Sequence, residues 1–234
     1  MAKFSFVVVA LVAIVLGFGV FAEANAQLSI DGYNMPVSAN VVAGSNVPVL
    51  RLRCRADNNN VVINKLRISQ VADQIYNRSV ESVTIQYSGA DGNGLTATQA
   101  VILGYADFNV TRAPIFVSGN GQEIINVLAN FTVIDESFAA YTGDMPRFAF
   151  IHDRNFEAVA GDDVFRSVGE EDIFGNLMVV RKSMPTFSMV QLEDPTLHNG
   201  QLNELYSFSV SANEAVDVSL ASIPLQMNLS APYL

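Results

Sequence analysis

The stretch "LRLRCRADNNNVVINKLRI" (residues 50–68) predicts two β-strands joined by a turn. In its first half, apolar residues alternate with arginines up to Ala56, and this period of two places the apolar side chains on one face of a strand. The asparagines that follow are typical of a turn. The second half predicts another strand, with Leu66 and Ile68 facing inward. An anion site, a reactive thiol at Cys54 and a plain pair of strands are three interpretations of this stretch.

Further along the chain, short segments with alternating apolar residues predict more strands. No helical pattern longer than two turns separates them. Several short strands between turn-rich breaks predict an all-β fold, either a sandwich or a barrel. The segments are Val80–Tyr87, Gln99–Phe108, Ala113–Val117, Ile124–Ile134, Pro146–Ile151, Phe156–Ala160 and Asn176–Lys182.

The composition limits the classes of function that the chain can have. It has 234 residues and a net charge of −10, and half of its residues are hydrophobic. Because binding to nucleic acid requires a cationic surface, we expect no nucleic-acid partner. The chain has one cysteine, so no intrachain disulfide can form, and the fold must rest on a hydrophobic core or on bound ions.

The first 26 residues have the pattern of a secretory signal peptide. One basic residue, Lys3, precedes eighteen uncharged and mostly apolar residues. The segment ends in Ala24-Asn25-Ala26, which predicts cleavage before Gln27. We therefore expect a secreted or cell-surface protein with no membrane span after the signal peptide is removed. An uncleaved N-terminal anchor is the alternative, since eighteen apolar residues are just long enough to cross a bilayer.

The opening stretch recurs, altered, near the C-terminus. After a shift of 156 residues, "GSNVPVLRLRCRA" (residues 44–56) falls on "GQLNELYSFSVSA" (residues 200–212). Cys54 then meets Val210 and the arginines meet serines, so the copies share only the apolar alternation. We therefore interpret Cys54 as a small buried hydrophobe. With a one-residue gap in the turn, the second strands match as well, through Val61 with Val218, Ile63 with Leu220, Leu66 with Ile223 and Ile68 with Leu225.

Residues 183–234 are therefore interpreted as the beginning of a second, incomplete β-sandwich repeat. Two strands alone are marginally stable in water, so these strands need further strands to pair with or another layer to pack against. Our preferred interpretation is that the sequence is a fragment of a longer multi-domain chain. The alternatives are that the two strands pair with the first domain, or that they complete a sheet in another subunit.

Five segments resemble the repeated β-sandwich modules of large secreted and cell-surface proteins of candidate-phyla bacteria. In the second copy they are "KSMPT" (residues 182–186), "YSFSVSAN" (206–213) and "VDVSLASIPL" (216–225), and in the first copy "VLRLRCRAD" (49–57) and "VVINKLRI" (61–68). The resemblance implies an immunoglobulin-like antiparallel β-sandwich that serves as a structural or adhesive unit.

The expected organisation follows from these patterns. A signal peptide (residues 1–26) precedes a linker or first edge segment (27–46). A β-sandwich domain (47–182) and the first strands of a second, similar domain (183–234) complete the chain.

Acidic side chains gather between residues 157 and 172, and these, with Asp91 in a second loop, are candidate calcium ligands. Carboxylate oxygens from such loops are the ligands that Ca²⁺ prefers. The alternative is that these loops are simply solvated and keep the surface soluble. The candidates are Asp91, Asp162, Asp163, Glu170, Glu171 and Asp172.

The sequence carries no catalytic signature, and we expect a protein that is not an enzyme. His152 and His198 lie in predicted loops, and no G-x-S-x-G motif accompanies them. Calcium apart, we expect no cofactor. We interpret the arginines of the opening stretch, with Lys65 and Arg67, as a basic stripe that pairs with the protein's own acidic loops or with a neighbouring domain.

The function predicted from these features is that of a secreted or cell-surface structural or adhesion module, a spacer or coat component. Its expected partners are other extracellular protein domains or cell-surface components. One alternative is a module that recognises glycan or protein through loops of the sandwich. The other is a fibre subunit assembled by strand exchange.

Overall fold

The structure is a computed structural model in which the described residues form strands, turns and loops and no helix. They make an all-β fold with two large antiparallel sheets, as the alternating sequence pattern predicts. The signal peptide predicted for residues 1–26 lies outside the described residues, and none of the described segments is a helix able to cross a bilayer. The described residues are 27–42, 44, 46–71, 79–134, 140–169, 171–194, 196–212 and 220–226.

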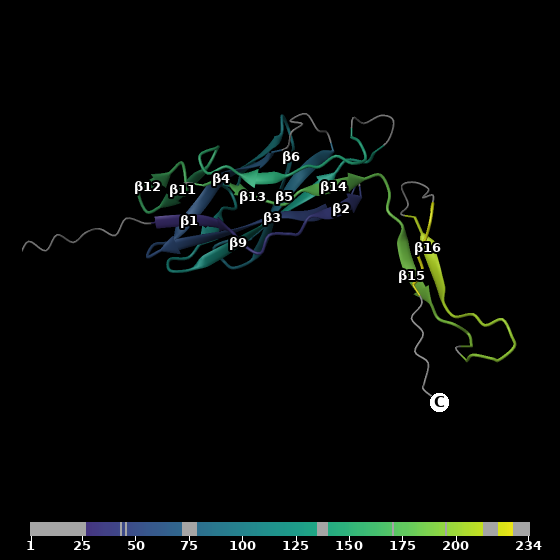
Figure 1. Ribbon diagram of the computed structural model, residues 1–234. Coiled ribbons are helices and arrows are strands. Elements are labelled where there is room, and N and C mark those ends of the chain that lie inside the picture. Colours follow the sequence, from purple (N-terminus) through teal and green to yellow (C-terminus); the bar gives the residue numbers. More distant parts are fainter. Residues whose placement is uncertain are drawn as a thin grey trace, which may run out of the picture.

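The first sheet has five strands in the order β1-β3-β9-β5-β6 (Figure 1). Strand β3 comes from the opening stretch and pairs antiparallel with β1 on one edge and with β9 on the other. Its residues Leu50, Leu52 and Cys54 are buried, and the arginines between them are not, as the period of two predicts. The strands are β1 (Gln27–Gly32), β3 (Asn46–Asp57), β5 (Val80–Ser88), β6 (Gly94–Ala100) and β9 (Gln122–Phe131).

The second sheet is built around the long strand β4. Two short strands, β8 and β7, lie end to end along one edge of β4, and β11 and β10 lie along the other edge. Strand β12 extends the sheet beyond β11, and β13 extends it beyond β10. The strands are β4 (Val61–Gln70), β7 (Tyr105–Asn109), β8 (Ile115–Val117), β10 (Phe148–Phe150), β11 (Glu157–Ala160), β12 (Asp163–Phe165) and β13 (Ile173–Phe174).

Strand β4 contains a β-bulge at Asn64. The residues buried on either side of it are Val61 and Ile63 before it, and Leu66 and Ile68 after it. The residues that face the core are therefore odd-numbered before Asn64 and even-numbered after it. The register of pairing with β11 shifts at the same place. The Asn64 carbonyl accepts a hydrogen bond from the backbone N–H of Val110 at 2.8 Å, between the segments that pair with β7 and β8. With this extra residue, β4 pairs with β8 and β7 along one edge and with β11 and β10 along the other.

The hydrophobic core lies between the two sheets. Its largest fully buried side chains include Phe131 from the first sheet and Phe108, Phe148 and Phe150 from the second. The rings of Phe150 and Phe156 meet edge to face, with centroids 5.8 Å apart. Burying a side chain of this size contributes about 2–3 kcal/mol to folding, so the core is the main source of stability.

A short parallel pair joins an early and a late segment of the sandwich chain at one end of the sandwich (Figure 1). Strand β2 (Ala39–Val42) pairs with β14 (Met178–Arg181), and Val41, Met178 and Val180 are buried. Residues 27–46, expected to form a linker or an edge segment, thus contain β1, which is an edge strand of the first sheet, and β2. The chain from β1 to β14 builds the sandwich.

Beyond the sandwich, two further strands form a ribbon, β15 (Thr186–Val190) and β16 (Ser207–Ser211), which pair antiparallel. In Figure 1 the ribbon lies away from both sheets. The sequence also predicts a strand over residues 216–225 in the second copy. Of this segment, residues 220–225 are described, and they form no strand. Their counterpart β4 is held by strands on both edges, and no strand of the described residues pairs with this segment.

Candidate interaction surfaces

The outer faces of both sheets carry pairs of polar residues that lie directly opposite each other on neighbouring strands. On the first sheet Arg53 faces Asp31 of β1, and two hydrogen bonds of 3.0 Å join the guanidinium to the carboxylate. Arg55 donates to the same carboxylate at 2.9 Å. Arg51 donates through Nε to Oδ1 of Asn126, its direct neighbour on β9, at 2.8 Å. Every arginine of β3 therefore has a partner within the first sheet.

On the second sheet, Arg67 faces Asp107 of β7. The guanidinium donates two hydrogen bonds to the carboxylate, at 2.6 and 2.8 Å, and stacks on the Tyr105 ring at 3.9 Å from its centroid. Asn155 donates to the same carboxylate at 2.7 Å. The hydrogen bonds from Arg67, and then that from Asn155, hold the pKa of Asp107 below its usual range, because they stabilise the ionised form.

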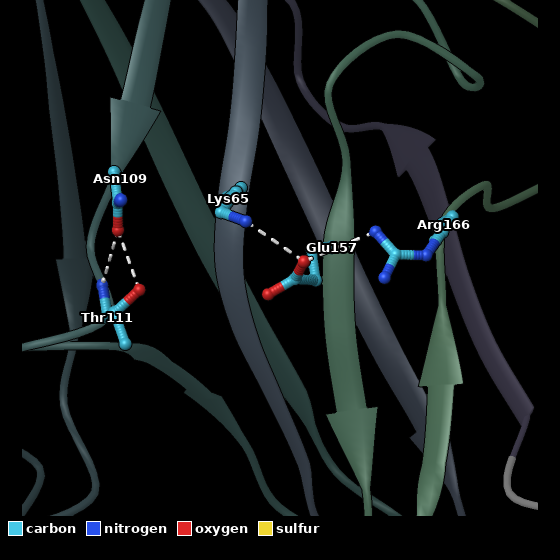
Figure 2. A network of polar contacts seen from close by, with 5 residues as sticks. All are labelled: Lys65, Asn109, Thr111, Glu157 and Arg166. Atoms are coloured by element: carbon cyan, nitrogen blue, oxygen red, sulfur yellow. Dashed lines mark hydrogen bonds and ion pairs between the residues drawn. The ribbon is translucent and has the colours of Figure 1, made fainter.

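A second polar group on this sheet surrounds Glu157 of β11 (Figure 2). Lys65 of β4 lies directly opposite Glu157, and Nζ is 3.0 Å from Oε2. Arg166, after β12, approaches the same oxygen at 3.4 Å from the other side. On the far side of Lys65, the side chain of Asn109 accepts two hydrogen bonds from Thr111 and shapes the turn after β7. On the outer face of the second sheet, Lys65, Arg67 and Arg166 each therefore lie next to a carboxylate.

The basic residues of the opening stretch do not form the single stripe that the sequence suggests. Arg51, Arg53 and Arg55 lie on the outer face of the first sheet, whereas Lys65 and Arg67 lie on the outer face of the second. The turn after β3 carries the chain from one sheet to the other, so the two groups point in opposite directions. Their partners are polar residues of neighbouring strands in the same domain.

Cys54 is a core residue. Its side chain is fully buried, and it forms no disulfide. Burial raises the pKa of the thiol, because a thiolate is poorly stabilised inside the core, and the nearby carboxylates of Glu123 and Asp31 raise it further. The interpretation of Cys54 as a small buried hydrophobe is confirmed.

The candidate calcium ligand Asp91 has a structural role in the turn between β5 and β6. Its carboxylate accepts hydrogen bonds from the backbone N–H and the side-chain amide of Asn93. These bonds lower the pKa of Asp91. Gly92 has a positive φ of 75° in this turn, a backbone conformation that a side chain would disfavour.

The remaining candidate ligands lie between β11 and β13. Asp162 is in the turn before β12, Asp163 is the first residue of β12, and Glu171 is exposed. Asp172 accepts hydrogen bonds from the backbone N–H of His152 at 3.3 Å and from its Nδ1 at 2.9 Å. Glu170 lies outside the described residues. Within the part of the chain that the structure describes, no three His, Cys, Asp or Glu residues are grouped so that they can hold a metal ion.

The second histidine is also held by a carboxylate. His198 Nε2 lies 2.9 Å from Oδ2 of Asp194, in the loop between β15 and β16. This contact, together with hydrogen bonds from Thr196, lowers the pKa of Asp194. Each histidine thus helps to fix a loop, by bonding a carboxylate four or twenty residues away.

A groove of about 680 Å³ opens between edge strand β6 and the turn that connects β7 to β8. Tyr87 forms part of its wall, and its hydroxyl donates to the Ala113 carbonyl at 2.7 Å. Exposed Arg112 lies at the rim, and none of the described carboxylates forms an ion pair with it. The lining residues are Tyr87, Thr96, Ala97, Asn109, Val110, Thr111, Arg112 and Ala113.

This groove was missed in the sequence because its walls come from separate segments. Residues 87, 96–97 and 109–113 meet only when the two sheets pack together. One local signal was available: Asn109 and Thr111 have the spacing of a side-chain-stabilised turn after a strand. That pattern indicates a turn and does not by itself indicate a groove.

Comparison with known proteins gives little further information. No protein-family model matches this chain, and no curated protein matches it. Among solved structures, it is similar to a family 123 glycoside hydrolase from Clostridium perfringens, known from work on glycolipid glycan hydrolysis. The identity is 9% and the TM-score 0.31, and the match covers 66% of this chain and 27% of the hydrolase chain. Likeness at this level carries no argument about function.

Proposed function

We propose that this protein is a non-enzymatic structural or adhesion module, exported to the cell surface or secreted, with an immunoglobulin-like β-sandwich as its unit. Residues 1–26 direct the export, and the module acts as a spacer or coat component between other extracellular domains. Its partners are extracellular protein domains or cell-surface components.

One observation carries this proposal: the β15–β16 ribbon repeats the β1–β3 pair of the sandwich. Cys54 lies opposite Ile30, and the aligned residue Val210 lies opposite Phe187. Recurrence of one strand pair in one chain is typical of proteins built from tandem structural modules. The outer faces support the same role, because their charges are paired within the sheets.

Antibody labelling of intact cells that express the full chain tests the proposal. An antibody against the sandwich is expected to label intact cells or to detect the protein in the medium. A cytoplasmic protein of the same cells is the control and must be labelled only after permeabilisation. Sandwich labelling that also requires permeabilisation would contradict the proposal.

The groove beside β6 supports a second candidate function, the binding of a glycan or a peptide. It presents the hydroxyls of Thr96 and Thr111 and the cation of Arg112 next to apolar Ala97 and Val110. Such a mixture of polar and apolar groups is common in ligand sites. A glycan array and a peptide array, both probed with the full chain, test this function. Binding that Arg112→Ala abolishes and Arg154→Ala retains supports it, since Arg154 is an exposed arginine outside the groove.

A further inference from the structure

The ribbon has the same register as the strand pair that it repeats. In the sandwich, Ile30 and Cys54 lie opposite each other and are 24 residues apart (54 − 30). In the ribbon, Phe187 and Val210 lie opposite each other and are 23 residues apart (210 − 187). The β15–β16 pair therefore matches the β1–β3 pair, with one residue fewer in the segment that connects the two strands. Each position of β16 has a counterpart in β3.

In the sandwich, the β1–β3 pair is covered twice. Strand β9 pairs with the second edge of β3 and supplies inward-facing Ile125 and Val127. The second sheet packs against the inner face. As a result, Leu52 and Cys54 are fully buried.

The ribbon has neither cover in the part of the chain that the structure describes, since its sheet consists of β15 and β16 alone. Phe187 is 52% exposed, Met189 77% and Tyr206 57%. The rings gather around Phe208, whose centroid lies 6.1 Å from that of Phe187 and 5.7 Å from that of Tyr206. An apolar face of this kind is unfavourable in water and marks a site of association.

The second edge of β16, with which no other described strand pairs, also lacks the features that keep strands apart. Residues 205–212 contain no charged residue, no proline and no glycine. Ser207, Ser209 and Ser211 stand where β3 has its arginines. Those arginines need Asn126 and Asp31 as partners, whereas serines need no charged partner. A strand that pairs with β16 can therefore be uncharged on its outer face.

We propose that the β16 edge and the bare face of the ribbon form an acceptor site for one β-strand of another β-sandwich module. The donated strand is extended and uncharged, has apolar side chains at alternate positions, and pairs antiparallel with β16 as β9 pairs with β3. The inference rests on the proposed structural function and names the partner that the module takes.

Strand β9 itself supplies the probe, a fluorescent synthetic peptide with the sequence of residues 122–131. Glu123 is replaced by Gln in the peptide, because Glu123 lies opposite Cys54 and would face Val210 in the ribbon. Fluorescence anisotropy is measured as the full chain is added. Saturable binding is expected, and a peptide of the same composition with its alternation scrambled is expected to bind at least about tenfold more weakly.

Two variants of the full chain test whether the ribbon is the site. Phe208→Asp places a carboxylate on the apolar face of β16, and Ser209→Asp places one on the opposite face of the same strand. The first is expected to weaken binding about tenfold or more, because it buries a charge against an apolar partner, and the second by no more than about twofold. Val210→Thr keeps the strand propensity and is expected to weaken binding several-fold, which covers the case in which Phe208→Asp disrupts the ribbon.

Three results overturn the proposal: no saturable binding, equal binding of the scrambled peptide, or equal effects of Phe208→Asp and Ser209→Asp. A dimer of the chain that excess peptide does not dissociate also overturns it, because β16 is then paired with a second copy. A chain found at the cell surface that does not bind the peptide refutes the acceptor site and leaves the structural function intact.

Discussion

Asp107 connects a single ionisation to the stability of the sandwich. Its carboxylate is held by Arg67 on the neighbouring strand, which keeps the Asp107 pKa below the ordinary value of 3.8. Since the folded state favours the ionised form, the stabilisation is complete above that ordinary value and is lost as the pH falls through the lowered pKa. We expect Asp107→Asn to reduce the free energy of unfolding by about 0.5–1 kcal/mol near neutral pH. Urea unfolding at a series of pH values measures this.

The pH dependence separates the ion pair from a packing effect. The difference between Asp107→Asn and the parent chain is expected to shrink as the pH falls below 3.8. Asp162→Asn, in an exposed turn, is the control and is expected to change the free energy by less than about 0.5 kcal/mol. If Asp107→Asn lowered the free energy of unfolding by the same amount at every pH, the effect would come from packing and not from the ion pair.

Cys54 gives a chemical probe of opening at the centre of the core. The side chain is fully buried and its pKa is raised by burial, so the reactive thiolate is scarce in the folded protein. We expect a thiol reagent to modify Cys54 only as fast as the sandwich opens, and rapidly in denaturant. The rate of modification, followed by absorbance, is the measurement. Rapid modification under native conditions would contradict the burial of this residue.

At the scale of elements, the bulge at Asn64 sets the register between the two halves of β4 and their partner strands. Deleting Asn64 restores a strict alternation in which Ile63, Leu66 and Ile68 still face the core, but it shortens β4 by one residue and removes the carbonyl that accepts the hydrogen bond from Val110. The strands that pair with one half of β4 must then shift their register, which is expected to cost about 2–4 kcal/mol. Asn64→Ala keeps the extra residue and is expected to cost less than about 1 kcal/mol. Circular dichroism and urea unfolding of the two variants distinguish the outcomes.

The strands that could be predicted from the sequence are those with one buried face. β9 alternates along its length, and β3 and β5 alternate from Leu50 and from Val83 onward, so that their apolar residues point into the core. Edge strand β6 was missed because none of its residues is fully buried and only Leu95 and Ala97 pack against the core. Short strands such as β12 and β13 depend on pairing with distant segments, which no local pattern reveals. For the same reason, the sequence indicated two strands and a turn in the opening stretch but not that they belong to opposite sheets.

The polar surface was predictable in composition but not in arrangement. The sequence suggested that its basic residues pair with acidic loops. In the structure their partners are polar residues on neighbouring strands, among them Asp31, Asp107 and Glu157, each directly opposite a cation. Which residues lie opposite one another depends on the order of strands in the sheet, and this order comes from tertiary packing. Cross-strand pairs of this kind also favour the native register over a shifted one.

At the scale of the whole molecule, the described residues contain one strand pair that is covered, β1–β3, and one that is not, the ribbon. Cys54 is fully buried in the sandwich, whereas Phe187, which lies opposite the ribbon counterpart of Cys54, is 52% exposed. The difference comes from what surrounds them, since a two-stranded ribbon cannot bury a face by itself. Stability is therefore expected to be concentrated in the sandwich, with the ribbon contributing little.

Truncation after Lys182 tests this division. It removes the ribbon, whose strands pair only with each other among the described strands, so we expect the free energy of unfolding of the sandwich to change by less than about 0.5 kcal/mol. The control is truncation after Gly175, which also removes β14 with its buried Met178 and Val180 and is expected to cost about 3 kcal/mol or more. Urea unfolding measures both. A large loss after the first truncation would mean that the ribbon stabilises the sandwich, and the two would then have to be treated as one folding unit.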